Sequence, residues 1–213
     1  MAKKSDYTTW TKEQCITAIE SLMKRKKYGL VWDEEREPEK VVLQCKKKLP
    51  VLNAVESMQI MNSDDGPTHI LIEGDNYHSL SVLNYTHENS FDVIYIDPPY
   101  NTGAKDWKYN NNYVDGNDAY RHSKWLAMIN KRFILAKKLL KPETGVFIVT
   151  IDEHEVHRLR MLVEEIFTNY YIQMVTAVTN PKGVTQGRFS RVEEYIIDMV
   201  FPVAEPMGKT RLD

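Results

Sequence analysis

A carboxylate, two prolines and an aromatic ring stand next to one another at Asp97, Pro98, Pro99 and Tyr100. Consecutive prolines fix the backbone φ angles and remove two N–H donors, so the backbone there offers only carbonyl oxygens. A carboxylate and a carbonyl can accept the two N–H bonds of an exocyclic amino group, such as adenine N6, while the base stacks on the ring. These bonds draw the nitrogen lone pair out of conjugation, which favours an in-line methyl transfer to that nitrogen without a covalent intermediate.

The alternative is that the same four residues form a rigid turn that merely ends a strand. The surrounding sequence favours a site. The preceding run FDVIYI, residues 91–96, is rich in β-branched and aromatic residues and is typical of a buried strand. The turn continues into Asn101, Thr102 and Gly103. We expect Gly103 to serve the backbone conformation, and Asn101 and Thr102 to line a cofactor or base pocket.

A second carboxylate, Asp75, follows a shorter apolar run at residues 69–72. Ligands of open α/β sheets bind beyond the carboxyl ends of the strands, so Asp75 and Asp97 are both expected at that edge. The alternative for Asp75 is the capping of a helix that begins near Tyr77, a position that suits aspartate.

Apolar runs and helical patterns alternate from residue 67 onward, which predicts an α/β fold with a mostly parallel sheet and helices on both faces. The box Asp152-x-x-Glu155 is expected to open one helix. Trp125 lies on the apolar face of another helix and is expected in the core. The expected strands are 69–72, 91–96, 146–150, 172–178 and 195–201, and the expected helices are 77–85, 121–140 and the one opened at 152.

The N-terminal part has a different pattern. Thr11-x-x-Gln14 is a capping box that precedes apolar residues at helical spacing, so it predicts one amphipathic helix. A polar connector, residues 62–67, follows a weakly patterned stretch. We therefore place a boundary there, with a helical extension over 1–66 and a catalytic domain over 67–213.

Composition excludes several classes of protein. The 213 residues include only 9 glycines, and no two are closer than four positions, so neither a dinucleotide fingerprint nor a Walker phosphate loop is present. Two cysteines are too few for a disulfide framework or a zinc cluster, and we expect no metal site and a reducing cytoplasm. No apolar run reaches the roughly 18 residues of a spanning helix, and the first residues do not form a secretory signal.

The net charge of −2 does not indicate a nucleic-acid partner, but some local features do. Aromatic rings in the polar loop 106–120, including Trp107 and Tyr109, either stack on a displaced base or pin the loop to the core. Basic side chains near residue 185 either contact phosphates or are solvated charge. His154 and His157 are interpreted as helix-surface residues without metal partners. The candidate nucleic-acid contacts are Trp107, Tyr109, Lys182, Arg188 and Arg191.

The tetrapeptide Asp97–Tyr100 resembles motif IV of the amino-methyltransferases that act on DNA. Together with further stretches, it makes residues 68–202 similar to the modification subunits of type III restriction–modification systems and to related β-class adenine methyltransferases. The Tyr28–Trp32 segment extends the similarity upstream. The stretches that carry it are 71–76, 94–103, 122–126, 145–152 and 194–197.

The resemblance implies transfer of a methyl group from S-adenosylmethionine to adenine N6 in double-stranded DNA. Because N6 lies inside the duplex, the base must be flipped into a pocket, where Tyr100 would stack on it. Asp75 matches the position whose carboxylate contacts the adenine end of the cofactor. The catalytic residues are then Asp97, Pro98, Pro99 and Tyr100, and the expected cofactor contacts are Asp75, Asn76, Asp97, Asn101 and Thr102.

The resemblance also implies a Rossmann-like methyltransferase fold in which target recognition and a glycine-rich cofactor loop follow the catalytic half. Neither segment precedes Asp213, so we expect an incomplete form of that fold and weak cofactor binding by the isolated chain. A restriction subunit and a second copy of the chain are the protein partners left open. One alternative is a non-catalytic fragment or subunit that gives structure or DNA contacts to a partner. Another is methylation of cytosine N4, although a Ser-Pro-Pro-Tyr turn would favour cytosine and Asp97 favours adenine.

Overall fold

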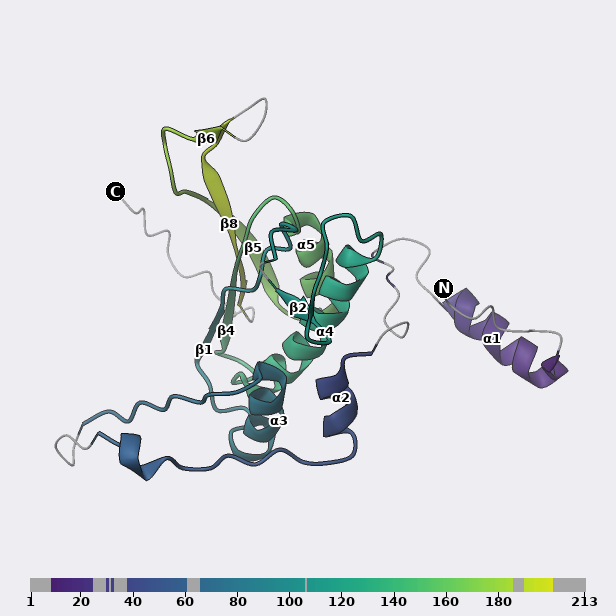
Figure 1. Cartoon of the computed structure of the whole chain (residues 1–213), viewed down its shortest axis with the longest axis horizontal. Coiled ribbons are helices and arrows are strands. Elements are labelled where there is room, and N and C mark those ends of the chain that lie inside the picture. The colour runs from purple at the N-terminus through teal and green to yellow at the C-terminus, as the bar shows by residue number, and fades with distance from the viewer. Residues whose placement is uncertain are drawn as a thin grey trace. The chain divides into compact units, whose positions relative to one another are not determined.

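The computed structural model describes residues 9–24, 30, 32, 38–60, 66–105, 107–185 and 190–200 (Figure 1). The chain divides into two compact units, Met1–Val31 and Trp32–Asp213. None of the helices in these described ranges combines the length and apolar character that crossing a membrane requires.

The first unit contains the predicted N-terminal helix, α1 (Lys12–Lys24). Its capping box is reciprocal, as expected: the Thr11 N–H donates to Gln14 Oε1 at 2.9 Å, and the Gln14 N–H donates to Thr11 Oγ1 at 3.3 Å. These two bonds satisfy donors that the first helical turn leaves unpaired, so the local sequence is enough to start the helix.

The second unit is built around a four-stranded sheet in the order β1-β4-β8-β5 (Figure 1). The strands are β1 (Val93–Ile96), β4 (Val146–Ile151), β5 (Tyr171–Val178) and β8 (Glu193–Val200). β1 and β4 pair in parallel, whereas β8 is antiparallel to both β4 and β5. The expected mostly parallel sheet is therefore corrected to a mixed one. The reason is that residues 179–185 fold back along residues 190–192, with the Thr179 N–H bonded to the Val192 carbonyl oxygen, so β8 returns antiparallel to β5.

Two short pairs accompany this sheet. β2 (Lys108–Tyr109) and β3 (Asn112–Tyr113) form a small antiparallel hairpin, and β6 (Val184–Thr185) pairs with β7 (Ser190–Arg191) in the connection between β5 and β8. The apolar run 69–72 does not form the expected strand. Ile70 and Leu71 are 73% and 95% exposed, so this run lacks the packing partners that would make a strand of it.

Helices α3 (Asn76–Thr86), α4 (Arg121–Leu139) and α5 (Val156–Ile166) agree with the expected positions. A short helix, α2 (Lys40–Cys45), packs against α3, and a 3₁₀ turn, η2, spans Glu56–Met58. The contact between α2 and α3 joins part of the predicted extension to the second unit. The boundary after residue 66 stays a prediction.

The core lies between α4, α5 and one face of the sheet. Alternate residues of β4 and of the second half of β8 point to this face and are fully buried, as the period of a strand requires. The Phe147 ring lies 5.0 Å from the rings of Phe133 on α4 and Phe167 after α5, so three aromatic side chains join the layers. Packing of this kind fixes the strand ends that carry the polar residues.

The opposite face of the sheet has no comparable cover among the described residues. Val93 and Tyr95 of β1 are 54% and 61% exposed, and Tyr171 and Val175 of β5 are 65% and 47% exposed. The expectation of helices on both faces is therefore wrong for the described part of the chain. That expectation came from apolar residues on both sides of the strands. These residues are present, but the described helices pack on one side of the sheet.

Candidate active site

The parallel register of β1 and β4 places Asp97 beside Thr150. The last backbone pair is Ile96 with Val149, so the next residue of each strand lies at the carboxyl edge of the sheet. There the Thr150 hydroxyl donates to Asp97 Oδ1 at 2.7 Å and lies 3.5 Å from the Ile96 carbonyl oxygen. Asp97 itself is exposed, so its carboxylate is open to a ligand at the edge where one was predicted.

The two prolines of the turn have different environments. The indole N–H of Trp125, on α4, donates to the Pro99 carbonyl oxygen at 2.6 Å, and the Trp125 side chain is fully buried. Pro98 is buried, but no hydrogen bond to its carbonyl comes from the residues described in the structure. Trp125 is a core residue, as predicted, and it also orients the turn through a bond that its apolar spacing did not reveal.

The Tyr100 side chain folds back toward the same carboxylate. Its hydroxyl lies within hydrogen-bonding reach of Thr150 and Asp97. Burial, together with the neighbouring Asp97 carboxylate, raises the pKa of Tyr100 to about 12, despite the opposing bond with Thr150. The phenol therefore keeps its proton well above physiological pH.

Asn101 ends the turn in the left-handed backbone region, with φ of 60°, and its side chain is buried. Its amide N–H donates to the Glu155 carboxylate, and its amide oxygen accepts the indole N–H of Trp107 at 3.1 Å. Both polar ends of Asn101 thus hold the loop in place rather than face a ligand. Thr102 is exposed, and its hydroxyl oxygen accepts the Ala104 N–H at 3.2 Å.

Glu155 is a buried carboxylate that sequence reasoning assigned only to a capping box. Besides Asn101, it receives hydrogen bonds from His122 and from Arg158, the latter at 3.3 Å. Arg121 Nε donates to His122 Nε2 at 3.2 Å, so the imidazole carries its proton on Nδ1 and gives it to Glu155. Three chain segments therefore meet at one carboxylate next to Asp97–Tyr100, the predicted catalytic turn.

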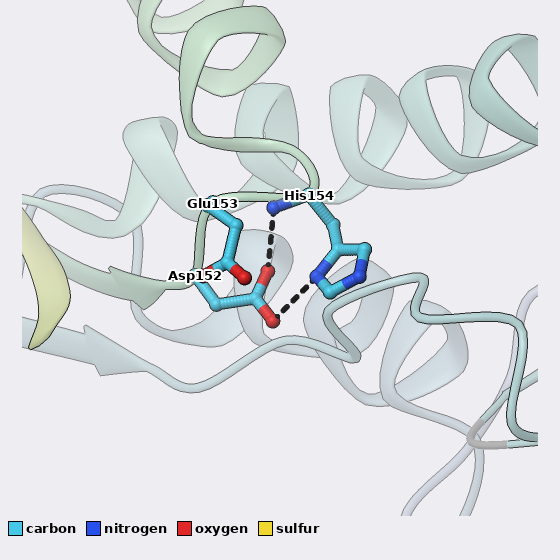
Figure 2. A group of neighbouring side chains, drawn as sticks. All are labelled: Asp152, Glu153 and His154. Atoms are coloured by element: carbon cyan, nitrogen blue, oxygen red, sulfur yellow. Dashed lines mark hydrogen bonds and ion pairs between the residues drawn. The ribbon is translucent and has the colours of Figure 1, made fainter. Parts of the chain in front are cut away.

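Asp152 shapes the entry to α5 (Figure 2). Its Oδ1 accepts the His154 N–H at 2.9 Å, and its Oδ2 lies 2.8 Å from His154 Nδ1. The ligand-type atoms of Asp152, Glu153 and His154 lie within 4.8 Å of one another, although the sequence pattern indicated no metal partners for His154. The buried Asp152 carboxylate uses these bonds to form the turn before the helix, in place of the reciprocal box expected with Glu155.

Asp75 and Asn76 lie at the start of α3 and contact Arg132 of α4. Asp75 Oδ1 accepts the Tyr77 N–H at 2.8 Å, so the capping alternative describes this bond, while the Asp75 side chain stays 46% exposed. Arg132 donates to Asn76 Oδ1 at 2.6 Å, lies 3.8 Å from Asp75 and forms an ion pair with Glu39 at 3.0 Å. Arg132 thus fixes both candidate cofactor contacts against α4.

The two parts of the candidate site contact the same side of α4. Trp125, which binds the catalytic turn, and Arg132, which binds Asp75, are seven residues apart and so share one face of the helix. At 1.5 Å per residue their backbones lie about 10 Å apart along the axis. The predicted cofactor end and the predicted methyl-transfer end therefore lie on one face of α4, two turns apart.

Two of the candidate nucleic-acid residues, Trp107 and Tyr109, lie together in the interior. Trp107 and Tyr109 are each 5% exposed, with ring centroids 6.0 Å apart, so they pin the loop to the core and offer no stacking face in this conformation. The expected stacking of Trp107 on a base is corrected, because its hydrogen bond with Asn101 holds the ring in the interior. Lys182 is exposed in a turn; Arg188 lies outside the described residues, as does the side chain of Arg191.

Tyr113 is an exposed aromatic residue of this loop, unlike Trp107 and Tyr109. It is 52% exposed, and Lys108 Nζ lies 4.8 Å from its ring centroid. Tyr113 borders a cavity of about 350 Å³ between the β2–β3 hairpin and the start of α4. Lys40 and Lys124 also line this cavity, and Lys124 forms an ion pair with Asp118 at 2.8 Å.

Comparison of the sequence with known proteins shows which proteins this chain is similar to. The chain is 36% identical over 126 residues to the probable type III restriction-modification enzyme HindVI Mod subunit of Haemophilus influenzae, covering 58% of this chain and 16% of that protein. It is 28% identical over 208 residues to the type III restriction-modification enzyme EcoPI Mod subunit of Escherichia phage P1, covering 86% and 32%. It is 29% identical over 168 residues to the type II methyltransferase M.KpnI of Klebsiella pneumoniae, covering 75% and 40%.

These similarities confirm the resemblance to type III modification subunits, although the chain spans well under half the length of each of these three relatives. Residues 91–200, which are 110 of the 213, match the family N6_N4_Mtase, described as DNA methylase. This range holds the catalytic turn, Trp125, Thr150 and Glu155. The chain belongs to the N6_N4_Mtase family of DNA methylases.

Proposed function

We propose that this chain carries the catalytic residues of a methyltransferase that acts on N6 of an adenine flipped out of duplex DNA. The supporting observation is the carboxyl edge of the sheet, where the exposed Asp97 carboxylate stands next to the Pro98 carbonyl and the Tyr100 ring. Two acceptors and a stacking surface match an exocyclic amino group on a planar base. An aspartate at the first position of the turn favours adenine N6 over cytosine N4.

In the proposed reaction, Asp97 and the Pro98 carbonyl accept the two N–H bonds of the amino group. The nitrogen lone pair then points away from the ring plane, toward the incoming methyl carbon. S-adenosylmethionine, when bound, supplies that methyl group on a sulfonium, which leaves as a neutral thioether as the N–C bond forms. The methylated nitrogen then loses one proton to solvent, and this restores the neutral base.

The proposed cofactor contacts divide into two groups by their state in the structure. Asp75 is half exposed and Thr102 is exposed, so their oxygens are accessible to a ligand, as is the carboxylate of Asp97. Asn76 and Asn101 are engaged with Arg132 and with Glu155, respectively. We therefore propose direct contacts for Asp75, Thr102 and Asp97, and a supporting role for the two asparagines.

Duplex DNA is the proposed partner, with Lys182, Arg188 and Arg191 as phosphate contacts and Tyr113 as an aromatic contact. The names of the relatives in type III restriction–modification systems suggest a restriction subunit as a protein partner. Such a protein would act in the cytoplasm, where the DNA is.

The test is the methylation state of DNA in a bacterial host that lacks adenine methylation and expresses the complete gene. Nucleosides from hydrolysed host DNA are separated and identified by mass spectrometry. N6-methyladenine is expected with the unchanged gene and is expected to be lost with Asp97→Ala. The matched control is Asp92→Ala, which removes an exposed carboxylate at the start of the same strand.

Three results would count against the proposal. N4-methylcytosine in place of N6-methyladenine would support the cytosine alternative. Undiminished N6-methyladenine with Asp97→Ala would remove Asp97 from the reaction. No methylated nucleoside from the unchanged gene, with folded protein present, would support a non-catalytic role.

A further inference from the structure

We propose that Trp125 and Thr150 are positioning residues that decide which two oxygen atoms of the catalytic turn accept the substrate amino group. Those atoms are the Pro98 carbonyl oxygen and Asp97 Oδ2. The inference rests on the proposed function, because it names the acceptors of the same reaction. It adds two side chains that touch neither the substrate nor the cofactor but act through the turn.

Trp125 determines which of the two proline carbonyl oxygens stays available to the substrate. Its indole N–H donates to the Pro99 oxygen at 2.6 Å, and because the indole is fully buried, water cannot easily replace this bond. The indole has a single donor, so it holds one carbonyl and leaves the other. The Pro99 carbonyl is thereby directed to the core, and Pro98 keeps the carbonyl that the described residues do not use.

Thr150 determines which of the two Asp97 carboxylate oxygens is bonded within the protein. Its hydroxyl has one hydrogen, and Asp97 Oδ1 lies at 2.7 Å, much closer than the Ile96 carbonyl at 3.5 Å. Asp97 Oδ1 is therefore engaged from the side of β4, and Thr150 leaves Oδ2 to the amino group. Since Thr150 pairs with Ile196 of β8, the sheet fixes the backbone from which its hydroxyl holds Asp97.

Thr150 also links the acceptor to the stacking ring. The Tyr100 hydroxyl lies within hydrogen-bonding reach of both Thr150 and Asp97, so one threonine hydroxyl contacts the two side chains expected to hold the base. Loss of that hydroxyl would let the carboxylate rotate and the ring move together. A displacement of about 1 Å at reacting groups can cost on the order of 10²-fold in rate.

The experiment compares three substitutions at Thr150 and Trp125 in the complete protein, with unmethylated DNA and labelled S-adenosylmethionine. Thr150→Val keeps the side-chain shape without the hydroxyl, and Thr150→Ser keeps the hydroxyl. We expect Thr150→Val to lower kcat about 10- to 100-fold with little change in the KM for S-adenosylmethionine, and Thr150→Ser to restore most of it. Trp125→Phe is expected to lower kcat as well. The matched control is Thr176→Val on β5, where the threonine is exposed.

A second readout does not depend on activity. In ¹⁵N NMR spectra the Trp125 indole N–H, assigned by its absence in Trp125→Phe, is expected to exchange slowly with solvent because it is buried and bonded. With ¹³C-labelled tyrosine, the Tyr100 resonance is expected to shift in Thr150→Val and to stay in place in Thr150→Ser and Thr176→Val.

The outcomes separate this inference from the proposed function. If the unchanged protein methylates no DNA but both NMR results hold, the proposed function fails while the arrangement of the turn stands. If the protein is active and Thr150→Val keeps its kcat, the positioning role of Thr150 is overturned. Equal losses of kcat in Thr150→Val and Thr150→Ser would also overturn it, because the hydroxyl would then not be the group that matters.

Discussion

The side-chain amide of Asn101 donates a hydrogen bond to the buried carboxylate of Glu155, 54 positions further along the chain. A second bond joins the same two segments, because the Thr150 hydroxyl donates to Asp97. The segment that carries the catalytic turn is thus tied at both ends to the segment that leaves β4. The geometry of the turn depends on residues that do not belong to it.

Glu155→Ala is expected to destabilise the protein by about 3 kcal/mol, since it leaves the buried Asn101 donor and the partly buried His122 donor without their acceptor. Urea unfolding followed by circular dichroism would measure the free energy of unfolding. Glu153→Ala, two residues earlier and exposed, is the control and should change it by less than about 0.5 kcal/mol. An equal effect of both substitutions would show that the buried carboxylate has no special role.

If Tyr100 holds the base by stacking, its ring matters more than its hydroxyl. Tyr100→Phe should then keep kcat/KM within a few-fold, whereas Tyr100→Ala should lose about 1–3 kcal/mol of transition-state stabilisation, or roughly 5- to 150-fold. Steady-state methylation of unmethylated DNA would measure both values. A loss in Tyr100→Phe as large as in Tyr100→Ala would assign the role to the hydroxyl instead.

Gly103 is expected to resist substitution. Its φ is 86°, and a Cβ added there would lie 2.9 Å from the Gly116 Cα, so Gly103→Ala brings both backbone strain and a close contact. We expect a cost of about 1–3 kcal/mol. Gly116→Ala is the matched control, because its added Cβ meets atoms only at ordinary contact distances. Thermal unfolding of the two variants would measure the difference, and equal midpoints would contradict this explanation.

Alkaline pH should weaken the fold through Tyr100. Burial and the nearby Asp97 raise the pKa of Tyr100 to about 12 from an ordinary value near 10. Between these values the unfolded chain loses the phenol proton while the folded protein keeps it, so the free energy of unfolding falls as the pH rises. Burial also raises the pKa values of Tyr77 and Tyr170, which act in the same direction.

The check is a series of urea unfolding curves between pH 9 and pH 11.5. Tyr100→Phe should make the decline of stability with pH less steep, since the phenylalanine has no proton to lose. Tyr85→Phe, which removes an exposed phenol on α3, controls for loss of a surface tyrosine. Identical slopes for the unchanged protein and Tyr100→Phe would refute the linkage.

The sequence was sufficient for features that depend on neighbouring residues. The turn at Asp97–Tyr100, the strand before it and the capping box at Thr11 are short patterns whose geometry follows from proline, β-branched residues and local hydrogen bonds. Apolar spacing predicts the helix Arg121–Leu139 to within one residue, because this spacing persists over five turns.

Features that join distant segments were not predicted. The Thr150 hydroxyl meets a residue 53 positions away, and no local pattern marks a threonine in a buried strand for such a bond. The reversed direction of β8 depends on how the chain returns after β5, whereas periodicity reports only that a strand is present. Trp107 illustrates the same limit, because whether an aromatic ring faces solvent depends on a partner, Asn101, that local spacing does not identify.

The position of β8 between β4 and β5 has a consequence for synthesis on the ribosome. β4 ends at Ile151, but the neighbour that it pairs with on one side runs from Glu193 to Val200. At 5–20 residues per second, about 2–10 s pass before that neighbour is made. During this interval the strand that carries Thr150 has an open edge, so the catalytic turn would reach its final geometry only after β8 has emerged and been inserted.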